Sequence, residues 1–445
     1  MAMEQETAER LVKEAIEVLR ANDRGGWTIP AGHIYPHQWL WDSCFIAIGL
    51  RHVDIERAKL EIRSLLRGQW DNGMVPHIVF NNEPGYGRDR VSERGDLNPF
   101  APSDVSTSGI TQPPLIAEAV FMIGQKLKLP ERRSWYKEVA GPLTRYHEWL
   151  YADRDPHKEG LALLLHPYES GLDNSPPWIS ELRKHSMPVW VSAVEKLRLD
   201  GFINLFRRDV KRKKLPPGQR ITNTEALAFW SVMRRMQRKA YNTEAILSRS
   251  VFAVEDLAFN CIFIRGNECL RQIARTAGYE LPKPLIENME RSKTAIEELF
   301  DEDRGLYYSR SFVTHKLIEE PTVASLLPLY SGAISKNHAA QLVSKLKDPD
   351  EFGLKWPVPS VPKTSGYFDP FKYWQGPTWV NTNWMIIDGL TKYGFGLEAK
   401  ELEHETLRMV AKGGMYEYFS PLNAKPAGAA DFSWTAALTI DLLKR

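Results

Sequence analysis

A recurring alternation between two kinds of helix constrains the fold of this chain more than any other feature. Near residues 42, 112, 255, 322, 379 and 434, a polar, aromatic-rich turn leads into a strongly apolar helical segment, and a more amphipathic helix follows. A helix that is apolar on all sides requires burial on all sides, whereas an amphipathic helix can face water. The alternation predicts an all-α fold with an inner and an outer ring of helices. An irregular bundle or a solenoid would satisfy the same periodicity.

The individual helices are predicted from apolar residues that recur every three or four positions, as Leu11 and Ala15 do in the first of them. Three short runs, at 77–80, 161–165 and 307–312, are instead typical of strands. The predicted helices span residues 4–21, 43–67, 112–127, 132–152, 224–241, 254–277, 284–300, 321–331, 336–347, 377–393, 398–412 and 435–444.

Two long segments interrupt the helical pattern. Segment 72–109 is rich in glycine, proline and charged residues, and segment 154–223 contains the basic run Arg-Arg-Asp-Val-Lys-Arg-Lys-Lys at 207–214. Long irregular connections in a compact domain are usually lids or binding loops. We therefore predict one domain over residues 1–445, with 72–109 and 154–223 as inserted loops that form a cap or lid near the functional site.

Composition narrows the class of protein. The hydrophobic fraction of 43% and charged fraction of 26% are those of an ordinary globular protein, and the net charge of +2 indicates neither a nucleic-acid nor a membrane-surface partner. No apolar run is long enough for a membrane span, and the polar N-terminus does not resemble a signal peptide. Cys44, Cys261 and Cys269 are too few for a disulfide framework and are expected to be buried thiols. The expected compartment is the cytoplasm.

Motifs for cofactor, metal or serine chemistry are not found. The Gly-Tyr-Gly-Arg run at 85–88 lacks the Lys-Ser/Thr and the strand–helix frame of a phosphate loop. The 11 histidines show no metal-binding spacing, and neither a Cys-x-x-Cys pair nor a Gly-x-Ser-x-Gly elbow is present. We therefore expect no cofactor and no metal.

Six of the 14 tryptophans lie in polar, turn-rich segments rather than in helix interiors. Core packing is the ordinary role of an aromatic ring. Repeated placement beside carboxylates and Gly/Pro turns instead favours rings that contact the C–H faces of sugars. The tryptophans placed in this way are Trp39, Trp41, Trp178, Trp374, Trp379 and Trp434.

Carboxylates within these turns are the strongest candidates for chemistry. Cleavage of a glycosidic bond needs one carboxylic acid to protonate the leaving oxygen and a second carboxylate as base or nucleophile. Asp173 stands in a Gly-Leu-Asp-Asn-Ser-Pro turn, where partial desolvation is expected to raise its pKa toward that of a general acid. Glu417 lies between two tyrosines, and Asp42 follows Trp41 at a helix start. Each could equally be a helix cap or an Asx turn, but their joint occurrence favours a glycoside-cleaving enzyme.

Four motifs carry a resemblance to a known family. They are Tyr-Pro-His-Gln-Trp-Leu-Trp-Asp at 35–42, Ser-Gly-Leu-Asp-Asn-Ser-Pro at 170–176, Tyr-Trp-Gln-Gly-Pro-Thr-Trp at 373–379 and Phe-Ser-Trp-Thr-Ala at 432–436. In this order they resemble glycoside hydrolase family 63, and within it the bacterial mannosylglycerate and glucosylglycerate hydrolases. The resemblance spans nearly the whole chain.

The resemblance implies an (α/α)6 barrel and an inverting mechanism on α-linked sugars. By the match of motifs, Asp173 corresponds to the general acid, Glu417 to the general base, and Asp42 to a residue that binds sugar hydroxyls. The residues assigned to the sugar pocket are Tyr35, Trp39, Trp41, Gln112, Trp178, Tyr373, Trp374, Gln375 and Trp379, and those assigned to loops that meet the glycerate end are Tyr86 and Arg207.

The sequence thus predicts an inverting α-glycoside hydrolase that releases a hexose and glycerate from glucosylglycerate or mannosylglycerate. The basic run at 207–214 would bind the carboxylate, although it could equally be a solvated loop. A neutral-sugar α-glucosidase or trehalase-like hydrolase, and a non-catalytic carbohydrate-binding barrel, are the alternatives. The expected partner is a small sugar, with no nucleic acid and no membrane, and a homo-oligomer is left open.

Overall fold

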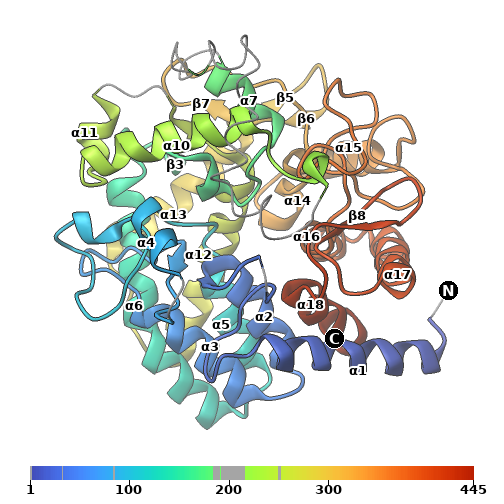
Figure 1. The fold of residues 1–445 in the computed structure, drawn as a ribbon, viewed down its shortest axis with the longest axis horizontal. Coiled ribbons are helices and arrows are strands. Elements are labelled where there is room, and N and C mark those ends of the chain that lie inside the picture. The colour runs from blue at the N-terminus through green and yellow to red at the C-terminus, as the bar shows by residue number, and fades with distance from the viewer. Residues whose placement is uncertain (1–2, 33, 84–85, 184–190, 192–215, 249–251) are drawn as a thin grey trace.

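The computed structural model describes residues 3–32, 34–83, 86–183, 191, 216–248 and 252–445 (Figure 1). Within this part of the chain, six helices pack in a closed ring, each against the next and the last against the first. In ring order they are α2 (Leu40–Leu50), α5 (Ile116–Gln125), α12 (Leu257–Ala277), α14 (Pro328–Ser331), α16 (Val380–Lys392) and α18 (Ser433–Lys444).

A second layer of helices packs on the outside of this ring. Burial explains the division, because every residue of α2 is buried, whereas the next helix in sequence, α3, buries residues along one face. The arrangement is an (α/α)6 barrel, so the predicted inner and outer rings are confirmed. The outer helices are α1 (Gln5–Asn22) on α18, α3 (Ile55–Arg67) on α2, α6 (Leu129–Asp153) on α5 and α12, α13 (Lys283–Ala295) on α12, α15 (Lys336–Lys347) on α14 and α17 (Gly396–Gly413) on α16.

Four predicted elements are wrong in their continuity. The helix predicted at 284–300 is α13 followed by a 3-10 turn, η6 (Ile296–Leu299), and a short strand, β5 (Phe300–Asp301). The single helix predicted at 43–67 is α2 and α3, because the chain turns after Arg51 and the Asp54 side chain accepts a hydrogen bond from the Arg57 backbone N–H at the start of α3. The helix predicted at 321–331 is a 3-10 turn, η7 (Val323–Leu326), followed by α14, which begins at a proline and therefore lacks one backbone donor. The strand predicted at 307–312 is two short strands, β6 (Leu306–Tyr307) and β7 (Arg310–Ser311).

The two inserted segments carry short ordered elements. Segment 72–109 contains β2 (Ile78–Val79), α4 (Gly87–Ser92) and η1 (Gly95–Leu97), and β2 pairs antiparallel with β1 (Gln38–Trp39) ahead of α2. The described part of segment 154–223 contains β3 (Leu163–Leu164), η2 (Pro167–Ser170), α7 (Pro176–Glu181) and η5 (Pro217–Gln219). β3, β4 (Val254–Glu255) and β7 form a three-stranded antiparallel sheet.

A small hydrophobic core, separate from that of the barrel, joins segment 154–223 to the residues that follow it. Trp178 of α7 packs in it with Phe229 and Met233 of α10 (Asn223–Arg238), beside α11 (Thr243–Leu247). The rest of the predicted cap, at 184–190 and 192–215, lies outside the described residues. No helix in the described part of the chain is both long enough and apolar enough to cross a membrane.

Candidate active site

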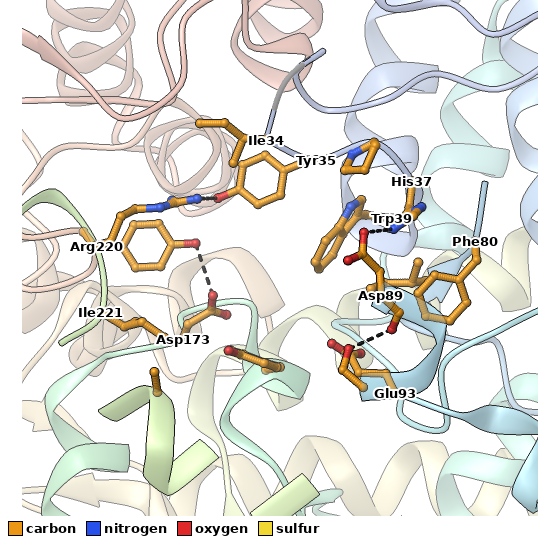
Figure 2. Close-up of a pocket in the computed structure, with 16 residues that line it drawn as sticks. Ile34, Tyr35, His37, Trp39, Phe80, Asp89, Glu93, Asp173, Arg220 and Ile221 are labelled. Atoms are coloured by element: carbon orange, nitrogen blue, oxygen red, sulfur yellow. Dashed lines mark hydrogen bonds and ion pairs between the residues drawn. The ribbon is translucent and has the colours of Figure 1, made fainter. Parts of the chain in front are cut away.

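A cavity of about 320 Å³ opens where the inner helices α2 and α16 begin. The segment before α2 contributes Tyr35 and Trp39, and the turn before α16 contributes Tyr373. Figure 2 shows Asp173 and Arg220 on one side of the cavity and Asp89 of α4 and Glu93 on the other. Pairing of β1 with β2 places Trp39 on this wall, since Trp39 pairs with Ile78.

Asp173 reaches the cavity because the chain turns sharply at Gly171. Gly171 is in the left-handed region (φ 71°), and a Cβ at this position would lie 2.7 Å from the Trp41 ring, so only glycine fits there. Asn174 then joins this turn to the segment before α16, since its Oδ1 accepts the Trp374 backbone N–H at 2.9 Å. This contact brings the Tyr373 hydroxyl to Asp173 Oδ2 at 3.1 Å.

The environment of Asp173 favours the protonated acid. Burial raises the pKa of Asp173 to about 7, although the hydrogen bond from Tyr373 and the charge of Arg220 oppose the increase. The helix-cap interpretation of Asp173 is wrong, because Ser175 is the cap residue of α7 and it makes no side-chain cap hydrogen bond.

Glu417 has a different environment. It precedes β8 (Tyr418–Phe419), which pairs antiparallel with β9 (Pro426–Ala427), and its side chain is only 1% exposed. Oε1 accepts hydrogen bonds from the Tyr35 hydroxyl at 2.7 Å and from Arg220 Nη1 at 3.1 Å, and Oε2 accepts the Ala429 backbone N–H at 2.8 Å. Glu417 is thus ion-paired with the Arg220 guanidinium.

Arg220 is the main site residue that sequence reasoning missed. Its guanidinium lies 5.2 Å from the centre of the Tyr35 ring and 4.9 Å from that of Tyr373, and Nη2 donates to the Tyr35 hydroxyl at 2.5 Å. Arg220 therefore contacts Tyr35, whose hydroxyl bonds Glu417, and Tyr373, whose hydroxyl bonds Asp173. Figure 2 shows Arg220 beside Tyr35. Gln219 fixes the segment, since its backbone O and its Oε1 accept the Tyr418 hydroxyl and the Gly428 N–H.

Several predicted pocket residues pack behind the cavity rather than line it. Trp374 and Trp379 stack 3.7 Å apart, and Trp41 lies against Trp374. Trp178 lies in the second core, where its Nε1 donates to the Leu172 backbone O at 2.9 Å. These rings are buried and support the residues that carry the cavity wall.

The polar residues in this layer bind neighbouring backbone. Gln112 Oε1 accepts the Trp41 backbone N–H at 3.4 Å, and Gln375 Nε2 donates to the Asn174 backbone O at 2.7 Å. Asp42 is buried at the start of α2. Burial raises its pKa well above the usual value, and the charges of Glu417 and Asp173 add to this increase.

Of the two residues predicted to meet the glycerate end, the structure describes only Tyr86. Tyr86 precedes α4 and its ring lies edge-on to His37 at 5.6 Å. Arg207 lies outside the described residues. The wall on this side instead carries Asp89, 3.0 Å from His37 Nε2, and Glu93, whose Oε2 lies 3.3 Å from His77 Nδ1. Nothing in the sequence distinguished these two carboxylates from the other charges of segment 72–109.

The barrel, the aromatic-lined cavity and the two carboxyl groups define a glycoside-cleaving enzyme. Residues 35–435 match the family model described as the mannosylglycerate hydrolase MGH1-like glycoside hydrolase domain. This chain belongs to that glycoside hydrolase family, so the resemblance stated from the sequence is confirmed.

Individual relatives are similar to this chain over almost their full length. The chain is 37% identical over 431 residues to the mannosylglycerate hydrolase of Thermus thermophilus, covering 96% of this chain and 99% of the relative. It is 33% identical over 456 residues to the glucosylglycerate hydrolase of Mycolicibacterium hassiacum, covering 98% of each. A crystal structure of the family 63 mannosylglycerate hydrolase from Thermus thermophilus, in complex with Tris and D-glycerate, matches with a TM-score of 0.86 and 35% identity, over 97% of this chain and 99% of the other.

Proposed function

We propose that this enzyme hydrolyses an α-linked glycoside with inversion, with Asp173 as general acid and Glu417 as general base. The observation that carries the proposal is the contrast between two linked carboxyl groups. Burial raises the pKa of Asp173 to about 7, whereas Glu417 is ion-paired with Arg220. Two carboxyl groups in such different surroundings can take different roles, one as proton donor and the other as proton acceptor.

The reaction then proceeds in one displacement. Asp173 donates its proton to the glycosidic oxygen while a water attacks the opposite face of the anomeric carbon and gives its proton to Glu417. A carboxylate offers about four lone-pair positions. Tyr35, Arg220 and the Ala429 N–H occupy three of those on Glu417, which leaves one for the water.

We propose glucosylglycerate or mannosylglycerate as the substrate, with a free hexose and glycerate as products. The named relatives act on these two glycosides, and D-glycerate is bound in the related crystal structure. Three buried free cysteines accord with the predicted cytoplasmic location, which stays a prediction.

One observation favours a second candidate, a neutral-sugar α-glucosidase. Of the described residues that line the cavity, Arg220 is the one arginine or lysine, and it is ion-paired with Glu417. Asp89 and Glu93 would repel a substrate carboxylate. A glycerate substrate would therefore need cations from outside these lining residues.

The test compares α-glucosylglycerate with α-glucosylglycerol, which differ only in a carboxylate against a hydroxymethyl group, together with mannosylglycerate and trehalose. A higher kcat/KM for a glycerate glycoside than for both uncharged sugars supports the proposed substrate. A higher kcat/KM for glucosylglycerol or trehalose overturns it in favour of the second candidate. No turnover of any α-glycoside would contradict the proposed reaction itself.

The pH profile is expected to report Asp173. Because the acid must be protonated, kcat/KM should fall as the pH rises through about 7. In Tyr373→Phe the hydroxyl that stabilises the carboxylate is lost, so the pKa of Asp173 rises and the fall in activity should move to higher pH. Tyr279→Phe, at an exposed tyrosine, is the control and should leave the profile unchanged. If the fall in kcat/KM of Tyr373→Phe occurred at the same pH as in the wild type or at a lower pH, Asp173 would not be the acid that the profile reports.

Gly428→Ala is expected to displace Glu417. Gly428 has φ 72°, and an added Cβ would lie 2.5 Å from Glu417 Oε2. Misplacing a reacting group by about 1 Å costs on the order of a hundredfold in rate, so we expect a fall of about that size in kcat/KM. The control is Gly278→Ala, which has a similar φ of 67° but no atom within 4 Å of the new Cβ. Equal losses in both variants would attribute the effect to backbone strain alone.

A further inference from the structure

Two histidines and a glutamate lie together outside the cavity lining, at the edge of the β3–β4–β7 sheet. His157 and Glu159 belong to the turn before β3, and His315 belongs to the hairpin after β7. One ligand atom from each side chain lies within 4.8 Å of those of the other two, and His315 Nδ1 is 3.8 Å from Glu159 Oε2. The group therefore joins two turns that are more than 150 residues apart in the sequence.

Both turns are fixed by their own hydrogen bonds. The Asp155 carboxylate accepts the backbone N–H groups of Glu159 at 2.9 Å and Gly160 at 2.8 Å. In the hairpin, the His315 N–H donates to the Ser311 carbonyl at 2.8 Å. The backbone positions of the three side chains are therefore set without any ligand, which reduces the entropy lost on binding one.

The side chains themselves are also oriented. His157 stacks on Phe312, with ring centres 4.5 Å apart, and lies nearly parallel to His315, at 5.7 Å and 12°. Arg310 donates to Glu159 Oε2 at 2.5 Å while it is ion-paired with Glu255. Since a carboxylate has about four lone-pair positions, the contact with Arg310 orients Glu159 and leaves acceptor positions for an ion.

We propose that His157, Glu159 and His315 bind a divalent transition-metal ion of the zinc class. Imidazole nitrogens with one carboxylate suit Zn²⁺, Ni²⁺ and Cu²⁺, whereas Mg²⁺ and Ca²⁺ prefer oxygen ligands alone. The side chains of Glu159 and His315 are 37% and 42% exposed, so an ion can enter from solvent and water can complete its coordination. The ion would cross-link the turn before β3 to the hairpin after β7.

The test is zinc titration of the metal-free, full-length protein by calorimetry near pH 7. We expect one Zn²⁺ per chain, no heat of binding with Mg²⁺, and at least about tenfold weaker zinc binding in His157→Ala and in His315→Ala, since each removes one of three ligands. The control variant is His404→Ala, on α17 and outside the cluster, which should bind zinc as the wild type does.

Two further measurements make the outcome decisive. The first is the melting temperature of each metal-free variant, which shows whether weaker zinc binding comes from a lost ligand or from a lost fold. The second is the effect of zinc on the melting temperature, which should rise in the wild type but not in His157→Ala/His315→Ala. Unchanged zinc affinity in that double variant, or no zinc binding by the folded wild type, overturns the proposal. Glycosidase activity is not used in any of these measurements, so the result does not depend on the proposed function.

Discussion

Replacing Asp173 with asparagine is expected to lower kcat/KM on a natural glycoside by between about a hundredfold and ten-thousandfold, the usual contribution of a positioned general acid. Asparagine keeps the size of the side chain and can still accept the hydrogen bond from Tyr373. It carries no acidic proton for the glycosidic oxygen. The loss should therefore appear mainly in kcat, with the melting temperature close to that of the wild type.

The leaving group provides the control for this prediction. The leaving group of an α-glycosyl fluoride is fluoride ion, which needs little protonation. Asp173→Asn should therefore hydrolyse this substrate at close to the wild-type rate. Equal losses on the fluoride and on the natural glycoside would contradict the acid role and make Asp173 a residue that positions substrate or water. Full activity on both substrates would remove Asp173 from the mechanism.

The barrel could be predicted from the sequence because its determinants are local. An inner helix such as α2 is buried at every position, and this requirement appears as the continuous apolar run that follows Ser43. Continuity was harder to predict, since the break between α2 and α3 depends on a turn of four residues, Arg51 to Asp54, within an otherwise helical pattern. The turns that carry Asp173 and Glu417 were also visible locally, through their glycines and aromatic neighbours.

The remainder of the site depends on contacts between distant residues. The Arg220–Glu417 pair spans 197 positions and the Tyr35–Glu417 hydrogen bond spans 382. No local pattern distinguishes Arg220 from the many other basic residues of its segment. Similarly, an aromatic residue beside a turn does not reveal whether its ring faces the cavity, as that of Trp39 does, or packs behind it, as that of Trp178 does.

Replacing Glu417 should lower kcat even on a substrate with a good leaving group. In Glu417→Gln the water loses its base, so kcat is expected to fall by about a hundredfold to ten-thousandfold on the natural glycoside and on the fluoride alike. The amide nitrogen would also lie among three donors, from Tyr35, Arg220 and Ala429, so the melting temperature must be measured beside the rate. Rescue by the fluoride would contradict the base role.

Glu417→Ala tests the same role without introducing an amide, and it also reports the face of the sugar on which Glu417 acts. Removing the carboxylate leaves the Arg220 guanidinium and the Tyr35 hydroxyl next to the vacated space, which favours a small anion there. Azide needs no base to attack the anomeric carbon, so added azide should restore turnover of the α-fluoride and form the β-glycosyl azide, with fluoride as the leaving group. Proton NMR of the product identifies the anomer. A β-azide supports Glu417 on the attacking face, whereas an α-azide would require a retaining mechanism and a different nucleophile. The anomer that the wild type first releases from the α-fluoride then distinguishes a base, which gives the β-sugar by inversion, from a nucleophile, which gives the α-sugar by retention.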